Sequence, residues 1–122
     1  MTAEVVGVDH VQLAIPEGGE EVARCFYRDI LGFQEVPKPE ALAARGGCWF
    51  ERGAVALHLG IDPEFRPARK AHPALLVSDI RAFSERIGAA GFPVRDDQPI
   101  EGYKRIFTED PFGNRIELMQ KL

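Results

Sequence analysis

The chain has 122 residues, 45% of them hydrophobic, and its 15 basic and 19 acidic residues give a net charge of −4. This length suits one compact domain with a single core. The basic residues are scattered, which argues against nucleic-acid binding, and no apolar stretch is long enough to span a membrane. The segment Met1–Glu4 lacks the features of a signal peptide, so we expect a cytoplasmic location.

The first half of the chain predicts a strand, a helix and three further strands. The expected ranges are 8–15, 20–31, 33–36, 48–52 and 54–61. In the helix, Val22, Phe26 and Ile30 recur at every fourth position and form the expected buried stripe. Gly32 is expected to end the helix, and Gly53 marks a tight turn between the last two strands.

After a linker at 62–69, the same order of elements returns. The expected ranges are a strand at 72–77, a helix at 80–90, and strands at 93–95, 103–109 and 115–120. Ser78 or Asp79 is expected to cap the helix, and its apolar stripe is Ile80, Phe83, Ile87 and Ala90. The sequence therefore predicts one α+β domain of two βαβββ modules, at about 5–61 and 70–122.

Four polar side chains occupy equivalent places in the two predicted modules. His72 lies 62 residues after His10 (72 − 10), and Glu117 lies 59 residues after His58 (117 − 58). Each interrupts an apolar alternation and so points away from the core-facing side chains of its strand. Three imidazoles and one carboxylate suit a divalent transition metal, and a cation would compensate a buried carboxylate. We therefore predict metal ligands at His10, His58, His72 and Glu117, provided that these faces converge.

Other residues carry weaker signals. Cys25 and Cys48 are expected to be free thiols, because two distant cysteines form neither a disulfide scaffold nor a CxxC motif. Trp49 and Phe50 are adjacent in a strand, so one should enter the core and the other the pocket or a dimer face. Gly113 is expected to supply a positive φ before the last strand.

Three segments resemble the vicinal oxygen chelate superfamily. The sequence DHVQL at 9–13 resembles its first strand, FYRDILGF at 26–33 its first helix and following turn, and DPFGNRIEL at 110–118 its closing turn and last strand. This superfamily includes glyoxalase I, fosfomycin-resistance proteins, methylmalonyl-CoA epimerase, extradiol dioxygenases and bleomycin-resistance proteins.

The resemblance implies two βαβββ modules that form a cupped half-barrel sheet around a metal, with helices on the outer face. Its ligands lie on the first and fourth strands of each module, which are the places of His10, His58, His72 and Glu117. The resemblance also implies a homodimer with shared sites, in which the first module of one chain often faces the second module of the other.

The second ligand position departs from two members of the superfamily. Resemblance to glyoxalase I leads us to expect Glu there, and resemblance to the epimerase Gln, whereas this chain has His58. Glu117 is then the only acid in the predicted shell, which disfavours glyoxalase I activity. In its predicted ligand set, the chain is more similar to members with two histidines and one glutamate, such as thiol transferases and dioxygenases. His58 would then be either a fourth ligand or a group that faces the substrate.

The function expected from these residues is metal-dependent lyase, isomerase or thiol-transfer chemistry on a small substrate that chelates the ion through adjacent oxygens. Zn²⁺, Ni²⁺, Mn²⁺ and Fe²⁺ all suit such a site. Glu117 would be both a ligand and a proton shuttle, while Gln12, Arg105 and Arg115 are candidates for holding the substrate. Two alternatives stay open: an Fe(II) extradiol-type dioxygenase, and a non-catalytic ligand-binding protein like those of bleomycin resistance.

Overall fold

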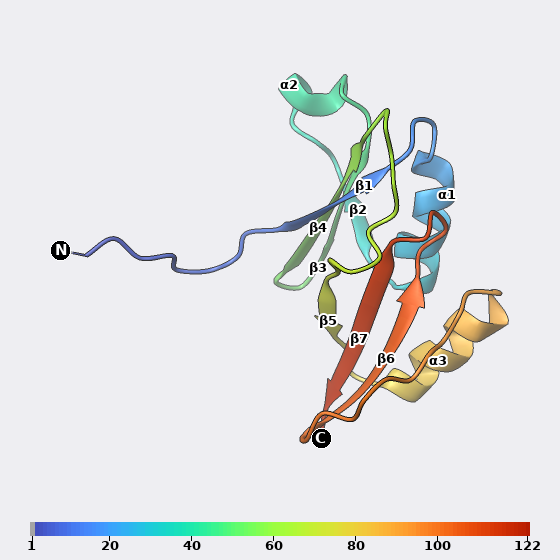
Figure 1. Cartoon of the computed structure of the whole chain (residues 1–122). Helices are drawn as coiled ribbons and strands as arrows, with labels where there is room; N and C mark the ends of the chain where they lie inside the picture. The colour runs from blue at the N-terminus through green and yellow to red at the C-terminus, as the bar shows by residue number, and fades with distance from the viewer. Residues whose placement is uncertain (1) are drawn as a thin grey trace.

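The computed structural model describes residues 2–122 as two open β-sheets whose long helices lie on the same side (Figure 1). The first sheet has the order β1-β4-β3-β2 and the second the order β5-β7-β6. The strands are β1 (Val11–Ile15), β2 (Gln34–Val36), β3 (Cys48–Arg52), β4 (Val55–Ile61), β5 (Ala74–Leu76), β6 (Tyr103–Glu109) and β7 (Arg115–Lys121). The helices are α1 (Glu20–Arg24), η1 (Cys25–Ile30), α2 (Glu40–Ala43) and α3 (Ile80–Ala89). The expected α+β class is confirmed.

The first strand is shorter than the alternation predicts. It begins at Val11 rather than at residue 8, and residues 2–9 project from the body as an extended segment (Figure 1). From Val11 onward, β1 runs parallel to β4 with Val11 opposite Leu57. Although these preceding residues have an apolar alternation, no neighbouring strand pairs with them within residues 2–122.

The first helix differs from an ideal α-helix, and its buried face differs from the predicted one. After Arg24 the chain continues as a π-helix, in which the backbone N–H of Leu31 donates to the carbonyl of Phe26. A π-helix holds more residues per turn, so it rotates the buried face. Val22 is consequently 50% exposed, while Ala23 and Tyr27 are buried beside Phe26.

The second half follows the predicted order with one strand missing. Asp79 caps α3 by accepting a hydrogen bond of 3.0 Å from the backbone N–H of Ala82, and Ile80 and Ile87 are buried, whereas Ala90 is exposed. The strand predicted at 93–95 was wrong. Only Arg95 pairs there, in an isolated bridge with Phe107, because Pro93 has no N–H to donate.

A buried polar network ties the turn before β7 to the first half of the chain. The carboxylate of Asp110 accepts hydrogen bonds from the Tyr27 hydroxyl at 2.7 Å and from the side-chain amide of Asn114 at 2.9 Å. The same amide donates to the carbonyl of Ala14 in β1 at 2.8 Å. Gly113 has φ +92°, as predicted for this turn. Since all three polar side chains are buried, the network fixes the two sheets relative to each other.

Candidate metal centre

The first candidate half-site consists of His10 and His58, which stack on each other. Their ring centroids lie 4.1 Å apart, and the indole of Trp49 stacks on His58 at 3.9 Å with an interplanar angle of 4°. The sheet register explains this contact, because Trp49 of β3 lies directly opposite His58 of β4. Phe50, the neighbour of Trp49, is fully buried, so the pair divides between site and core as predicted.

The environment of His58 favours its neutral form. The side chain is buried, and desolvation lowers its pKa below the usual 6.5, with a further contribution from the neighbouring charge of His10. A neutral imidazole keeps a lone pair free for a metal or a hydrogen-bond donor. His58 is thus held as a base near neutral pH.

Gln12 lies beside this half-site and shares its pocket of about 560 Å³ with His10, Trp49 and His58. It is the parallel-strand partner of His58. Its side chain passes over Gly60, where an added Cβ would come within 2.6 Å of the amide nitrogen. The absence of a side chain at Gly60 therefore leaves room for Gln12 to lie across the strand.

The second candidate half-site consists of His72 and Glu117. The Nε2 of His72 lies 2.9 Å from Oε1 of Glu117, and its Nδ1 lies 2.8 Å from the carbonyl oxygen of Lys70. The carbonyl only accepts, so Nδ1 donates, and Nε2 is left as the atom that faces the carboxylate. The Nδ1 contact orients the ring in the way that outer hydrogen bonds orient metal-ligating histidines.

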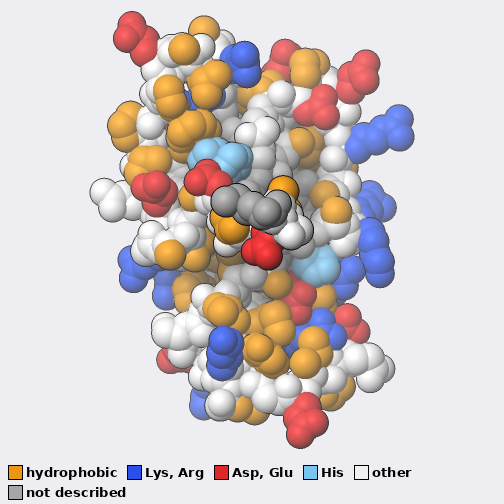
Figure 2. Space-filling view, turned by 90° about the vertical axis from the view of Figure 1, so that its left-hand side faces the viewer, with side chains coloured by type: hydrophobic (Ala, Val, Ile, Leu, Met, Phe, Trp, Pro, Cys, Tyr) orange, Lys and Arg blue, Asp and Glu red, His pale blue; other side chains and the backbone are white. Residues whose placement is uncertain are grey.

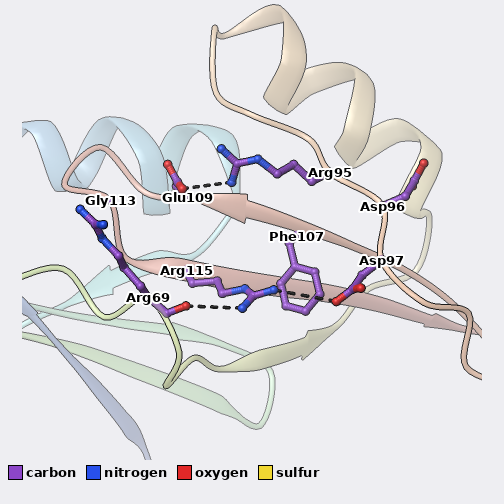
Figure 3. Close-up of a pocket in the computed structure, with 8 residues that line it drawn as sticks. All are labelled: Arg69, Arg95, Asp96, Asp97, Phe107, Glu109, Gly113 and Arg115. Carbon is purple, nitrogen blue, oxygen red and sulfur yellow. Dashed lines mark hydrogen bonds and ion pairs between the residues drawn. The ribbon is translucent and has the colours of Figure 1, made fainter.

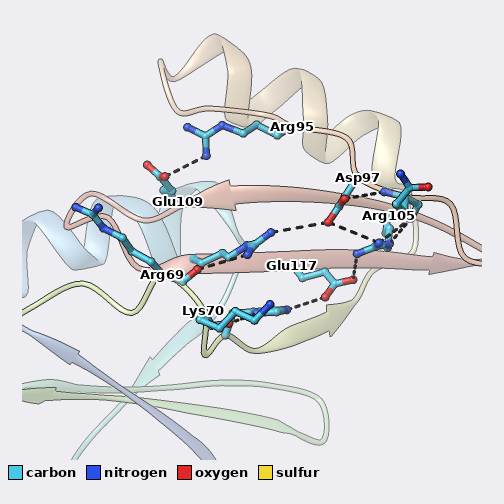
Figure 4. Close-up of polar contacts among 10 residues, drawn as sticks. Arg69, Lys70, Arg95, Asp97, Arg105, Glu109 and Glu117 are labelled. Carbon is cyan, nitrogen blue, oxygen red and sulfur yellow. Dashed lines mark hydrogen bonds and ion pairs between the residues drawn. The ribbon is translucent and has the colours of Figure 1, made fainter.

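The guanidinium of Arg105 neutralises the charge of Glu117 (Figure 4). Its Nη1 donates to Oε2 of the carboxylate at 3.2 Å, and both side chains are nearly buried, with exposures of 12% and 8%. Arg105 is anchored in turn by the carbonyl of Gln98 and by Asp97, whose carboxylate lies 3.8 Å away. The carboxylate therefore lies between the guanidinium of Arg105 from β6 and the imidazole of His72 from the segment before β5.

Arg115 lies on the same sheet face as Glu117 and covers the ring of Phe107 (Figure 3). Its guanidinium carbon is 3.9 Å from the ring centroid, and that of Arg105 is 5.3 Å from the same ring. The surrounding pocket has a volume of about 370 Å³ and includes Arg69 and Arg95. Because Phe107 is itself buried, the two guanidiniums over its ring leave positive charge, rather than an aromatic surface, on this sheet face.

The structure places the four predicted ligands in two separate pairs. Within residues 2–122 there is no group of three or more His, Cys, Asp and Glu side chains placed to hold one ion. Histidine side chains are visible in two separate places on one face of the molecule, on either side of the projecting N-terminal segment (Figure 2). The expected convergence of four inner faces on one cavity is therefore not found within a single chain, since the two sheets stay separate.

The family model of the Glyoxalase/Bleomycin resistance protein/Dioxygenase superfamily matches residues 7–118. The chain belongs to this superfamily. Among curated proteins, none matches it. None of the helices in the described part of the chain has the length and hydropathy to cross a membrane.

Solved structures of this superfamily's fold match the chain over nearly its full length. A Bacillus anthracis protein assigned to the glyoxalase family is 45% identical, with full coverage of both chains and a TM-score of 0.94. FosX, a fosfomycin resistance protein from Listeria monocytogenes, is 16% identical over 98% of this chain and 96% of its own, with a TM-score of 0.75. TnmS3, an antibiotic binding protein from a Streptomyces species, is 22% identical over 97% and 100%, with a TM-score of 0.72.

Sequence analysis did not find every residue of this candidate site. Sequence analysis named Arg105 as a candidate for holding the substrate, but it did not predict the ion pair of Arg105 with Glu117. Phe107 was missed, although it alternates with Arg105 in β6 and is the register partner of Glu117. An aromatic residue two positions after Arg105 in the same strand was the available signal. Asp97 had no such signal, because it lies in a loop.

Proposed function

We propose that two copies of this chain form a shared centre, in which His10 and His58 of one copy and His72 and Glu117 of the other bind a divalent transition metal. Each half-site offers two donors of suitable chemistry, and a homodimer would supply the remaining two. The observation that carries this proposal is the contact of 2.9 Å between His72 and Glu117, with the other ring nitrogen anchored on the Lys70 carbonyl. An imidazole nitrogen and a carboxylate oxygen then lie side by side, as two ligands of one ion would.

The proposed reaction is lyase, isomerase or thiol-transfer chemistry on a small oxygenated substrate. The metal would act as a Lewis acid that stabilises negative charge on substrate oxygens. Glu117 accepts a proton at a carboxylate oxygen and returns it, while Gln12 donates a hydrogen bond from its amide. Arg105 and Arg115 bind a carboxylate or phosphonate of the substrate beside Phe107. The fold of FosX, which has been solved with Mn(II) and a dihydroxypropylphosphonic acid, supports this substrate chemistry.

The first experiment is metal analysis by mass spectrometry of untagged protein purified without chelators. We expect near-stoichiometric metal in the parent, and its loss in both His10→Ala/His58→Ala and His72→Ala/Glu117→Ala. Cys25→Ala is the matched control, because Cys25 is exposed and lies outside both half-sites. A parent without metal, and without uptake on titration near neutral pH, would overturn the metal proposal.

Complementation tests whether the site is shared. After joint refolding of the two double variants, half of the dimers are mixed, and each mixed dimer has one intact site. About a quarter of the parent's metal should therefore return. No recovery would show that each chain completes its own site. If Fe²⁺-loaded protein consumed oxygen with catechols, the dioxygenase alternative would replace the proposed chemistry.

A second candidate function is ligand binding without catalysis. It is favoured by the neutralisation of Glu117 by Arg105 and by the stacked Trp49 and His58, which form a ready aromatic surface. Under this alternative, a ligand would bind the His72→Ala/Glu117→Ala variant as tightly as the parent, and neither protein would turn it over. Loss of binding in that variant would rule the alternative out.

A further inference from the structure

A groove of about 470 Å³ lies where the turn between β3 and β4 approaches β5 and α3, outside both half-sites (Figure 1). Phe83 and Arg86 of α3 line it on one side. Leu118 of β7 also lines it and is buried in the core, so it points away from the sheet face that carries its neighbour Glu117. The groove is therefore formed on the helix side of the second sheet, and a ligand there would not meet the candidate metal ligands.

Apolar side chains form most of the walls of this groove. Phe33 and Leu118 are buried at the core, whereas Leu76 and Val55 are 60% and 41% exposed. Exposed apolar side chains are ordinary when they are scattered, but here they border one concave surface. A concavity of this volume with apolar walls is of the size that holds a small organic molecule.

Two arginines without acidic partners border the same groove. None of the ion pairs found within residues 2–122 includes Arg52 or Arg86, and no Asp or Glu lines the groove. The groove is thus positively charged in a chain whose net charge is −4. Because an apolar surface with uncompensated positive charge is complementary to an anion with an apolar body, the charge indicates the class of ligand.

The guanidinium of Arg86 is held in place on one side only. Its Nη1 donates to the carbonyl of Ile30 at 2.9 Å, and its central carbon lies 4.8 Å from the ring centroid of Phe83. Within the described part of the chain, its Nε and Nη2 donate to no other group. These N–H groups are therefore oriented by the fold and remain available to a carboxylate, which a guanidinium binds through two parallel hydrogen bonds.

We infer that this groove binds a small amphiphilic carboxylate, separately from the candidate metal centre. The carboxylate accepts hydrogen bonds from Arg86, Arg52 adds a second positive charge, and the apolar body of the ligand lies along Leu76 and Val55. A neutral or cationic amphiphile would leave both arginines without a partner. A small hydrophilic anion would leave the apolar walls in contact with water. The groove therefore requires both properties in one molecule.

The test is isothermal titration calorimetry of the chelator-treated full chain with decanoate, a carboxylate on an unbranched apolar body. We expect saturable binding of one molecule per chain. Arg52→Gln/Arg86→Gln should raise the dissociation constant by ~10-fold or more, because glutamine removes the positive charge. Arg45→Gln/Arg66→Gln is the matched control and should leave it unchanged. These two arginines are exposed, lie outside the groove, and belong to no ion pair found within residues 2–122.

A second pair of variants tests the apolar walls. Val55→Ser/Leu76→Ser should also raise the dissociation constant by ~10-fold or more, because less apolar area is then buried by the ligand. Val22→Ser/Val94→Ser is the control, since these valines are 50% and 38% exposed and lie outside the groove. Decan-1-ol and decyltrimethylammonium, which have the apolar chain without the negative charge, should bind the parent at least ~10-fold more weakly than decanoate.

Four results would overturn the inference. The first three are the absence of saturable decanoate binding, equal effects of the groove and control variants, and binding of decan-1-ol as tight as that of decanoate. The fourth is an affinity for decanoate that falls as the protein concentration rises, because a second copy of the chain would then cover the groove. All of these measurements use metal-free protein, so the inference and the proposed metal centre can fail separately.

Discussion

The hydroxyl of Tyr27 donates a hydrogen bond of 2.7 Å to the carboxylate of Asp110, across 83 positions of the sequence. Burial raises the pKa of this hydroxyl well above 10, and the charge of Asp110 contributes in the same direction. Tyr27 therefore remains a donor throughout the usual pH range. Through Asn114, the same carboxylate is linked to β1.

Tyr27→Phe should lower the free energy of unfolding by about 1–3 kcal/mol, because it leaves the buried Asp110 carboxylate short of one donor. Urea denaturation followed by circular dichroism measures the change. Tyr103→Phe is the matched control, since no hydrogen bond to the Tyr103 hydroxyl is found within residues 2–122. Equal effects of the two variants would mean that the network does not stabilise the fold.

Cys48 should make the protein sensitive to alkaline pH. Burial raises the pKa of its thiol from 9.0 to about 11. The folded protein therefore keeps the proton while the unfolded chain loses it, so this contribution to stability is complete below pH 9 and is lost as the pH rises to about 11.

Over that range, the parent should lose about 2 kcal/mol more unfolding free energy than Cys48→Ala. Cys25→Ala, at an exposed thiol, should behave like the parent. The measurement is urea denaturation at a series of pH values. Parallel curves for parent and Cys48→Ala would contradict the prediction.

The ion pair between Arg105 and Glu117 should show strong coupling in chelator-treated protein. Arg105→Met leaves a buried carboxylate with fewer partners and should cost about 3 kcal/mol. Adding Glu117→Gln should return about 1 kcal/mol or more of this loss, because the charge that needed compensation is gone. A double-mutant cycle by urea denaturation tests this, and strictly additive effects would refute it. Arg81→Met, which breaks an exposed pair with Glu85, should cost well under 1 kcal/mol.

Substitution by alanine should change the stability of the protein in opposite directions at two glycines. Gly47 has φ +84°, and an added Cβ would lie 2.1 Å from the carbonyl oxygen of Leu59. Gly47→Ala should therefore destabilise the protein by about 2 kcal/mol or more. Gly88 lies within α3 with nothing within 4 Å of an added Cβ, so Gly88→Ala should stabilise it by about 0.5–1 kcal/mol. Thermal denaturation distinguishes these outcomes, and a common sign for both would contradict them.

The local sequence pattern correctly predicted those strands and helices whose first and last residues are determined by their own side chains. The bounds of β3 and β6 are the predicted ones, and α3 begins after the predicted cap at Asp79. The start of β1 depends instead on where a neighbouring strand is present. The spacing of apolar residues in the sequence gives no sign of the π-helix after Arg24. The periodicity therefore indicated an ordinary α-helix, and the buried face predicted from it was wrong. The short helix α2 was not expected at all.

For the candidate site, alternation indicated which side chains leave the core, but not which of them meet. His72 precedes β5 rather than lying within it, and it still reaches Glu117 because the parallel register places Ala74 beside that residue. The separation of the two pairs depends on how the two sheets lie relative to each other. That relationship is set by buried contacts such as Asn114 with Ala14, which have no periodic signal.

Trp49 is the only tryptophan of the chain, and it stacks on His58. The intrinsic fluorescence of the protein therefore originates at the candidate site itself. Protonation of this imidazole, its coordination to an ion, or insertion of a molecule beside the indole should each change the emission. The protein thus carries its own optical reporter, and a library of metals and small acids can be screened on the unlabelled chain before any reaction is known.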